Sequence, residues 1–277
     1  MLGVPTSAAR GSARHRLAGA IAALLLALGA VSGGAAEELR VATYNAQSGE
    51  REVPTISALI ARCAPHVAAL QELSPEGARR LDEALASTFA YRAFPPASQG
   101  GGLGLVASVP IHHLRYRPSA AGGNGFMFAE LDVDGRRVQV ANLHLDPLKT
   151  WTWALRLSLP WQWLRHGSVH RSELEQVFGE LRPDLPTLIV GDLNSYGSNA
   201  APQTLVGRGF VDSYAAEAGA AADDTVTHRF SLAGAEFGGR IDFIFHSADL
   251  RTLDSRIVAG TPSDHDLLMS SLEWANR

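Results

Sequence analysis

Short apolar runs that end in polar residues recur along this chain. The run Thr187–Val190 follows Pro186 and leads through Gly191 to Asp192 and Asn194. Its β-branched, apolar composition predicts a buried strand. Side chains two residues apart on extended backbone point the same way, so we expect Asp192 and Asn194 to emerge side by side at the strand end. The alternative is a strand followed by an ordinary Asx turn.

The first third of the chain repeats this pattern between helices. The segment Leu39–Asn45 alternates and ends in an amide, and the short strand Val67–Leu70 ends in Gln71-Glu72. Pro54–Cys63 carries its large apolar residues on one helical face, and Ser74–Ser87 begins with the cap, proline and acid of a helix start. The order strand, helix, strand, helix predicts an α/β fold.

From Tyr91 to Leu145 the pattern changes to strands and turns. The segments Phe126–Val133 and Arg136–Leu143 flank Asp134-Gly135, which predicts a hairpin. His144 follows the second strand directly. The glycine-rich run 101–108 is a predicted strand rather than a phosphate-binding loop, because no Gly-Lys-Ser/Thr follows it.

The remaining segments supply two more polar positions. A helix is predicted for Ser168–Glu180 and a strand for Gly239–Phe245. Asp242 falls within that strand among apolar neighbours, where a free carboxylate is costly unless it is paired or metal-bound. Asp264-His265 stands just before the last predicted strand, Leu267–Leu272. With no repeat or linker to divide it, residues 37–277 are expected to form one domain.

Residues 1–36 have the composition of a secretory signal peptide. Three arginines precede an uncharged apolar run, Leu17–Val31, which is followed by small residues up to Ala36. The alternative is a membrane anchor, but the run is short for a bilayer span. We expect cleavage after Ala36 and export to the periplasm or the medium.

The net charge and the cysteine content bear on the binding partners and on the expected role of Cys63. Removing the three arginines of the leader from 24 basic residues leaves 21 against 28 acidic ones, a net charge of −7. This balance gives no general electrostatic reason to bind nucleic acid or an anionic membrane. Cys63 is the only cysteine. We expect no intrachain disulfide, and a packing role for Cys63 rather than a nucleophilic one.

Eight polar residues fall at or near predicted strand ends or, for one of them, within a strand: Asn45, Glu72, His144, Asp192, Asn194, Asp242, Asp264 and His265. Carboxylates without cysteine partners suit a hard cation such as Mg²⁺ or Mn²⁺. Imidazoles and amides beside such a cation suit an anionic phosphate, whose developing charge they can stabilise.

These motifs, in this order, resemble the endonuclease/exonuclease/phosphatase superfamily, which has the DNase I-like fold. They are Tyr44-Asn45, Gln71-Glu72, His144-Leu145, Gly191–Asn194, Arg240–Ile244 and Ser263–His265. The resemblance covers about residues 39–274. It implies a four-layer α/β sandwich in which two mostly antiparallel sheets pack face to face under helices.

The resemblance also implies roles, carried over residue by residue. Glu72 matches the principal metal ligand, with Asn45 and Asp264 supporting it. Asp192 matches the residue that activates the attacking water, and Asn194 an amide that binds phosphate. His265, oriented by Asp242, and His144 match phosphate-side residues, and Arg171 resembles an arginine that opens a helix in relatives. Gln47 departs from nucleases that carry an acid there, which puts a second metal in doubt.

The segment Trp151–Trp163 bears on the substrate, because it holds four of the five tryptophans. It could form a hairpin or a helical lid that meets lipid, cover the domain's own core, or stack on the bases of single-stranded nucleic acid.

Three functional hypotheses follow. The leading one is a monomeric, exported, metal-dependent phosphodiesterase or phosphatase acting on a lipid headgroup or small phosphorylated molecule. A secreted DNase-type endonuclease is the alternative; nucleic acid is not favoured as a partner because the chain lacks a basic-aromatic stripe. A non-catalytic binding module is the third, and the intact set of site residues argues against it.

Overall fold

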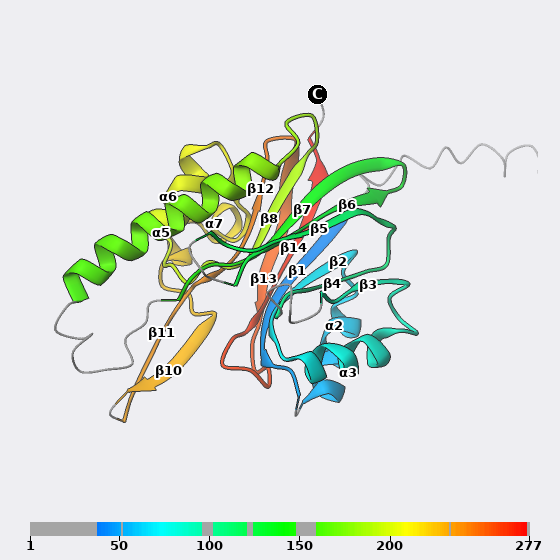
Figure 1. Ribbon diagram of the computed structural model, residues 1–277, viewed down its shortest axis with the longest axis horizontal. Helices are drawn as coiled ribbons and strands as arrows, with labels where there is room; N and C mark the ends of the chain where they lie inside the picture. Colours follow the sequence, from blue (N-terminus) through cyan, green and yellow to red (C-terminus); the bar gives the residue numbers. More distant parts are fainter. Residues whose placement is uncertain are drawn as a thin grey trace, which may run out of the picture. The chain divides into compact units, whose positions relative to one another are not determined.

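Two mixed β-sheets of six strands each form the centre of the protein (Figure 1). The computed structural model describes residues 38–50, 52–95, 102–120, 124–147, 159–232 and 234–275. The predicted leader lies outside these residues, so its removal and the domain boundary at Glu37 stay predictions. Within the described ranges, none of the helices combines the length and the apolar composition that a membrane crossing requires.

The first sheet is built from both ends of the domain. Its strands are β1 (Leu39–Ser48), β2 (Val67–Leu73), β3 (Tyr91–Ala93), β4 (Gly104–Ala107), β13 (Leu250–Val258) and β14 (Leu267–Trp274). They lie in the order β13-β14-β1-β2-β4-β3. β1 and β2 run parallel and the other neighbours antiparallel.

The second sheet comes from the middle of the chain. Its strands are β5 (Ile111–Arg117), β6 (Phe126–Val133), β7 (Arg136–His144), β8 (Thr187–Asp192), β9 (Val211–Asp212) and β12 (Asp242–His246). They lie in the order β5-β6-β7-β8-β12-β9. Only β7 and β8 run parallel among its neighbours. The predicted hairpin is confirmed: Asp134 and Gly135 join β6 to β7 with positive φ angles of 53° and 82°, as a type I′ turn requires.

Helices cover the outer faces of the two sheets, as the predicted four-layer sandwich requires. They are α2 (Val53–Cys63), α3 (Pro75–Leu85), α5 (Leu159–Glu180), α6 (Ala200–Gly207), α7 (Ser213–Ala218) and the short 3₁₀ helix η2 (Gly219–Ala222). In Figure 1 the sheets lie between α2 and α3 on one side and α5 and α6 on the other. A separate two-stranded hairpin, β10 (His228–Leu232) and β11 (Ala235–Gly239), extends from the sandwich.

Three apolar clusters fill the spaces between these layers. Inward residues of both sheets, among them Val41, Val140 and Ile244, form the central cluster. A second cluster lies between the first sheet and α2 and α3, and a third between the second sheet and α5 and α6. Each inner strand therefore has apolar residues on both faces, which explains why its sequence is a nearly continuous apolar run.

Three local expectations needed correction. α5 begins at Leu159, nine residues before the predicted Ser168, because Pro160 occupies its first turn, where no backbone N–H is needed. Asp242 is the first residue of β12 rather than a residue within a strand, since β11 ends at Gly239. Trp161 and Trp163 belong to α5, whereas Trp151 and Trp153 lie outside the described residues.

Candidate active site

The predicted polar residues meet at one edge of the sandwich because of the strand directions. β1 and β2 are parallel, so Asn45 and Glu72 reach the same edge of the first sheet. β7 and β8 are parallel in the second sheet, which brings His144 opposite Asp192. β12 runs antiparallel to β8, so its first residue, Asp242, pairs with the last residue of β8, Asp192.

Side-chain alternation explains why most of these residues face one another across the sandwich. In β1, β7 and β8, the residues Val41, Val140 and Val190 point into the central apolar cluster. Asn45, His144 and Asp192 follow them at even intervals, so they continue the same inward rows. The site is thus the polar end of the space between the sheets.

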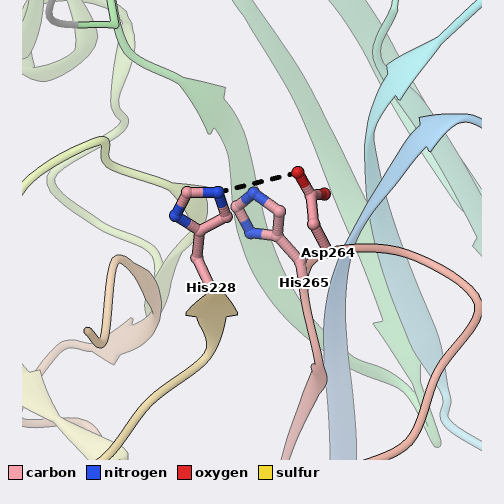
Figure 2. Close-up of side chains that lie close together, drawn as sticks. All are labelled: His228, Asp264 and His265. Carbon is pink, nitrogen blue, oxygen red and sulfur yellow. Dashed lines mark ion pairs between the residues drawn. The ribbon is translucent and has the colours of Figure 1, made fainter. Parts of the chain in front are cut away.

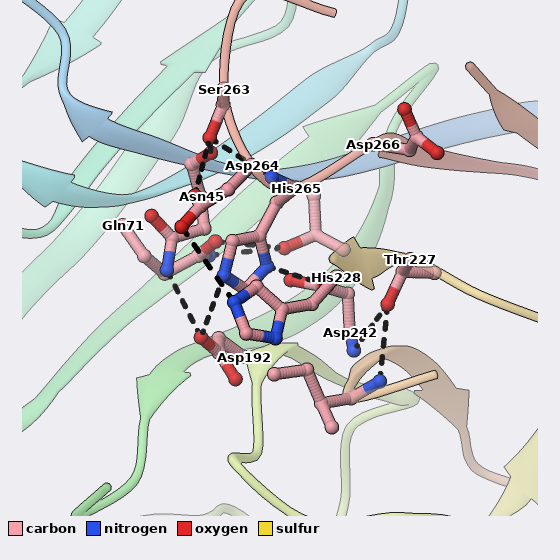
Figure 3. Close-up of polar contacts among 12 residues, drawn as sticks. Asn45, Gln71, Asp192, Thr227, His228, Asp242, Ser263, Asp264, His265 and Asp266 are labelled. Carbon is pink, nitrogen blue, oxygen red and sulfur yellow. Dashed lines mark hydrogen bonds and ion pairs between the residues drawn. The ribbon is translucent and has the colours of Figure 1, made fainter. Parts of the chain in front are cut away.

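Asp192 contacts site residues of both sheets, and Figure 3 shows its contacts with Asn45 and His265. Its Oδ2 accepts a hydrogen bond from Asn45 Nδ2 at 3.0 Å and lies 3.8 Å from Nε2 of both His144 and His265. The side chain is almost fully buried. Burial, together with the neighbouring carboxylate of Asp242, raises the pKa of Asp192 against the opposing effect of the two imidazoles. A carboxyl group with a raised pKa is a stronger base than an ordinary aspartate.

His265 is held by a buried carboxylate. Its Nδ1 donates to Oδ2 of Asp242 at 2.9 Å, and Asp242 is fully buried. Burial alone would lower the pKa of His265, but Asp242, Asp192 and Asp264 together raise it to about 10. The imidazole is therefore a positive charge at neutral pH, aimed at Asp192 through its Nε2.

Glu72 is the solvent-exposed carboxylate beside Asn45 and His144. It has a positive φ of 53°, and the β1–β2 register shifts beyond Asn45, as at bulges that re-aim a side chain. Oε1 of Glu72 accepts from Asn45 Nδ2 at 2.9 Å and lies 3.5 Å from His144 Nε2. With 41% of its side chain exposed, Glu72 is accessible from solvent.

Asp264 lies beside a histidine that the sequence analysis did not identify. Figure 2 shows His228, from β10, next to Asp264 and His265. Nε2 of His228 is 3.6 Å from Oδ2 of Asp264, and its ring centroid is 4.4 Å from that of His265. Gln47 Nε2 donates to the same Asp264 oxygen at 3.0 Å. Burial would raise the pKa of Asp264, but the two histidines lower it.

The base of the β10–β11 hairpin is tied into the site. Thr227 Oγ1 accepts from the backbone N–H groups of Ile241 and Asp242 at 3.1 and 3.2 Å. Thr227 O accepts from Asp266 N at 2.7 Å, and Arg229 N donates to Asp264 O at 2.9 Å. A histidine before an alternating segment gives no strong sequence signal, which is why His228 was missed.

Asn194 does not extend the strand as predicted. β8 ends at Asp192, and Asn194 has a positive φ of 46°. Its N–H donates to Asp192 Oδ1 at 2.8 Å, and its Nδ2 donates to Leu145 O at 2.9 Å. The first of these is the Asx hydrogen bond, which an aspartate side chain readily accepts from the backbone N–H two residues later. Asn194 consequently links the loop after β8 to the loop after β7.

Arg171 is separate from this group. It is exposed in the middle of α5 rather than at the helix start. Within the described ranges it has no hydrogen bond or ion pair with the other predicted site residues. Its predicted contact with substrate stays a prediction.

The donor set fits a divalent cation. One ligand atom from each of Glu72, His144 and Asp192 lies within 4.8 Å of the others. The carboxylates among them supply oxygen ligands, which suit Mg²⁺ or Mn²⁺. Asp264 falls in a different group, with His228 and His265. Asn45 presents its amide nitrogen to Glu72 and Asp192, while its carbonyl oxygen accepts from Gln47 N at 3.1 Å. Here Asn45 links the two carboxylates, and its role as an oxygen ligand stays a prediction.

Comparison with known proteins finds a family model that matches most of the chain. The model of the endonuclease/exonuclease/phosphatase family matches residues 42–265. No curated protein matches the chain significantly.

Solved structures share the fold at low identity. An endonuclease/exonuclease/phosphatase from Beutenbergia cavernae is 19% identical, with a TM-score of 0.66 over 86% of this chain and 72% of that one. TDP2 from D. rerio, complexed with a single-strand DNA product, is 15% identical, with a TM-score of 0.68 over 85% and 99%. An AP endonuclease from Archaeoglobus fulgidus is 15% identical, with a TM-score of 0.64 over 84% and 98%.

Proposed function

The chain belongs to the endonuclease/exonuclease/phosphatase family, and we propose that it is an exported phosphodiesterase or phosphatase that requires Mg²⁺ or Mn²⁺. We propose a lipid headgroup or a small phosphorylated molecule as its substrate. The observation that carries the chemistry is the position of Asp192, a buried carboxylate with a raised pKa between the imidazoles of His144 and His265.

Each residue of this group has a part in hydrolysis. Asp192 holds the attacking water and takes its proton. His265, kept positive by Asp242, and His144 from the opposite side contact the phosphate oxygens and stabilise their developing charge. Glu72, the solvent-accessible carboxylate of the group, would hold the cation, with support from Asn45 and Asp264. When bound, the cation supplies charge neutralisation to the phosphate. Most of the catalysis then comes from positioning and charge.

The β10–β11 hairpin supports a substrate with an apolar part. Phe230 and Phe237 are register partners with ring centroids 5.6 Å apart, and 40% and 48% of their surfaces are exposed. Phe230 in turn lies 5.7 Å from the ring of His228, beside His265. The cation of the hairpin, Arg229, is paired with Asp266. An exposed apolar ribbon whose arginine is already paired suits a neutral lipid surface better than a polyanion.

A second candidate is a nuclease acting on single strands. The structure of D. rerio TDP2 holds a single-strand DNA product, and a row of aromatic rings beside a phosphate site could also stack bases. The net charge of −7 expected for the mature chain argues against it. The same two phenylalanines would serve either substrate, so the assay must separate them.

The test is hydrolysis by the mature protein with Mg²⁺, Mn²⁺ or EDTA. Sphingomyelin-containing vesicles, plasmid and single-stranded DNA, and a soluble phosphodiester are offered in parallel, with Asp192→Ala as the inactive control. We expect metal-dependent turnover of lipid or the soluble ester. Turnover of DNA alone would move the protein to the nuclease hypothesis, and cation binding without any turnover would leave a binding module.

A double variant identifies the role of the hairpin. Phe230→Ser with Phe237→Ser should weaken turnover of vesicles and leave the soluble ester unaffected. Leu114→Ser removes another exposed apolar side chain, 47% exposed on β5, and serves as the matched control. An equal effect of the double variant on vesicles and on the soluble ester would refute the lipid contact.

A further inference from the structure

A row of buried polar side chains on α5 faces the loops that carry the site residues. His166, His170 and Glu173 are four and three residues apart, so they share one face of the helix. His166 is 8% exposed, and His170 and Glu173 are fully buried. Leu174 and Val177 pack on the same side in the cluster beneath the second sheet. Polar groups buried among apolar neighbours need hydrogen-bond partners. These three find them in the site loops, and Glu173 also accepts from Ser119 Oγ at 2.7 Å.

The first loop that hydrogen-bonds to α5 is the one that follows β7. Asp146 stands two residues after His144, and its carbonyl oxygen accepts from Nε2 of both His166 and His170 at 2.8 Å. Its backbone N–H donates to Oε2 of Glu173 at 3.2 Å. Helix α5 therefore holds the backbone on both sides of Asp146.

The second loop follows β8 and is reached by His170 alone of these three. Nδ1 of His170 lies 2.9 Å from Oγ of Ser195, the residue after Asn194. The loops also contact each other, since Leu145 N donates to Asp192 O at 3.1 Å. One imidazole thus connects the segment of His144 with the segment of Asp192 and Asn194.

The hydrogen bonds define the protonation state of this imidazole. A carbonyl oxygen can only accept, so Nε2 of His170 carries the proton and Nδ1 accepts from the Ser195 hydroxyl. Burial and the ring of His166, 3.9 Å away, lower the pKa of His170 to about 4. The ring is therefore neutral at the pH at which the enzyme would work, and this bonding pattern is fixed.

We propose that His170 is a positioning residue. It fixes the segments that follow His144 and Asp192 by holding Asp146 with one nitrogen and Ser195, next to the Asn194 N–H that binds the Asp192 carboxylate, with the other. This proposal rests on the proposed hydrolytic function. Its physical basis is that reacting groups must be held closely, because a misplacement of about 1 Å can cost about 100-fold in rate.

Three substitutions separate the two contacts. His170→Leu fills a similar space and removes both hydrogen bonds. His170→Gln places an amide nitrogen near the position of Nε2 and keeps the contact with Asp146. His170→Asn places an acceptor near Nδ1 and keeps the contact with Ser195.

The chain offers a matched control in His246. This residue is 2% exposed, with Nδ1 2.9 Å from Ser247 O and Nε2 3.0 Å from Thr252 Oγ1. Like His170, it joins a backbone carbonyl to a hydroxyl, and burial lowers its pKa. It lies at the opposite end of β12 from Asp242. His246→Leu should therefore lower the Tm as His170→Leu does, without a comparable effect on catalysis.

The readout is kcat and KM on a soluble phosphodiester, with Tm measured alongside. We expect His170→Leu to lower kcat about 10- to 100-fold, as loss of a supporting contact commonly does, with KM within about threefold. His170→Gln and His170→Asn should each recover part of the loss, and His246→Leu should keep kcat within about twofold.

The outcomes separate this proposal from the proposed function. Equal kcat in His170→Leu and the wild type, or an equal loss in His246→Leu, would overturn the positioning role. If His170→Leu does not fold, Ser195→Ala removes one contact alone, and a kcat unchanged in that variant would overturn the proposal as well. A wild-type protein inactive on every phosphoester would instead refute the hydrolytic function.

Discussion

Replacement of Asp242 by asparagine should remove the charge that keeps His265 protonated. Asp242 is fully buried, its Oδ2 accepts from His265 Nδ1 at 2.9 Å, and its Oδ1 has no hydrogen-bond partner within the described ranges. Asparagine has the same shape and keeps the acceptor. Because Oδ1 is otherwise unpaired, replacing it with an amide breaks no bond. The substitution therefore changes charge with little change in packing.

The size of the effect follows from the pKa of His265. Burial opposes protonation, yet the three carboxylates led by Asp242 raise the pKa from 6.5 to about 10, which corresponds to about 5 kcal/mol of favourable interaction. Because the folded-state pKa is the higher one, this stabilisation is fully present below pH 6.5 and is lost as the pH rises through about 10. At pH 7 it amounts to about 4 kcal/mol. Asp192 and Asp264 remain in the Asp242→Asn variant, so we expect it to lose about half of this stabilisation of the protonated His265.

The pH dependence of kcat/KM is the assay, with a soluble phosphodiester as substrate. The wild type should lose activity only as the pH approaches 10, whereas Asp242→Asn should lose it at least about one pH unit lower, because the pKa of His265 falls. NMR titration of the His265 ring in EDTA gives the same comparison without turnover. Asp254→Asn, which removes an exposed carboxylate paired with Arg256 on β13, is the control. An alkaline limb at the same pH in the Asp242 variant and the wild type would refute the reasoning.

Three further perturbations test the site and its frame. Asp192→Asn should lower kcat at least about 1,000-fold, because the base is lost. The same variant should not lower the Tm in EDTA, because it removes a buried charge beside Asp242. A large fall in Tm would mean that Asp192 is structural. Glu72→Gln should raise the Mg²⁺ concentration for half-maximal activity at least about tenfold, and an unchanged requirement would exclude Glu72 as a ligand. Gly191→Ala should lower the free energy of unfolding by more than about 3 kcal/mol, since a Cβ there would lie 2.0 Å from Leu143 O at a φ of +137°. Gly209→Ala, at a φ of +86° in open space, should cost only about 1 kcal/mol, and equal losses in urea titrations would contradict the steric explanation.

Much of the site could be predicted because the fold places strand ends together. Asn45, His144 and Asp192 each end or nearly end an apolar strand, and period-two alternation is legible in a single sequence. Strand direction then determines which ends meet, and the resemblance to a known family supplied those directions. The sequence pattern alone predicted polar ends without showing that they share one edge.

Other features depend on contacts that leave no local pattern. Asn194 was expected on extended backbone, but its bond to Asp192 turns the chain, and both conformations are compatible with the same two polar residues. His228 approaches His265 only because a hairpin folds back beside the last loop. His166, His170 and Glu173 do have a helical spacing, but that spacing is also compatible with an exposed face. Burial, which a sequence shows only indirectly, distinguishes the two.

The alignment of the two sheets is set by a buried amide network rather than by apolar packing. Gln71 Nε2 donates to Thr43 Oγ1 in its own sheet at 3.0 Å and to Asn142 Oδ1 in the other at 2.8 Å. Asn142 Nδ2 returns hydrogen bonds to the carbonyls of Leu70 and Gly104, both at 3.0 Å. All three side chains are fully buried.

Apolar faces can slide with little change in buried area, whereas each broken bond of this network would leave a buried polar group unsatisfied, at about 1–3 kcal/mol. Glu72 comes one residue after Gln71, Asn45 two after Thr43, and His144 two after Asn142. The network therefore fixes the separation between the carboxylate of one sheet and the imidazole of the other. This gives Gln71 a role in the motif although its side chain is buried and does not face the substrate. Its hydrogen bonds to Thr43 and Asn142 hold Glu72 and His144 in position.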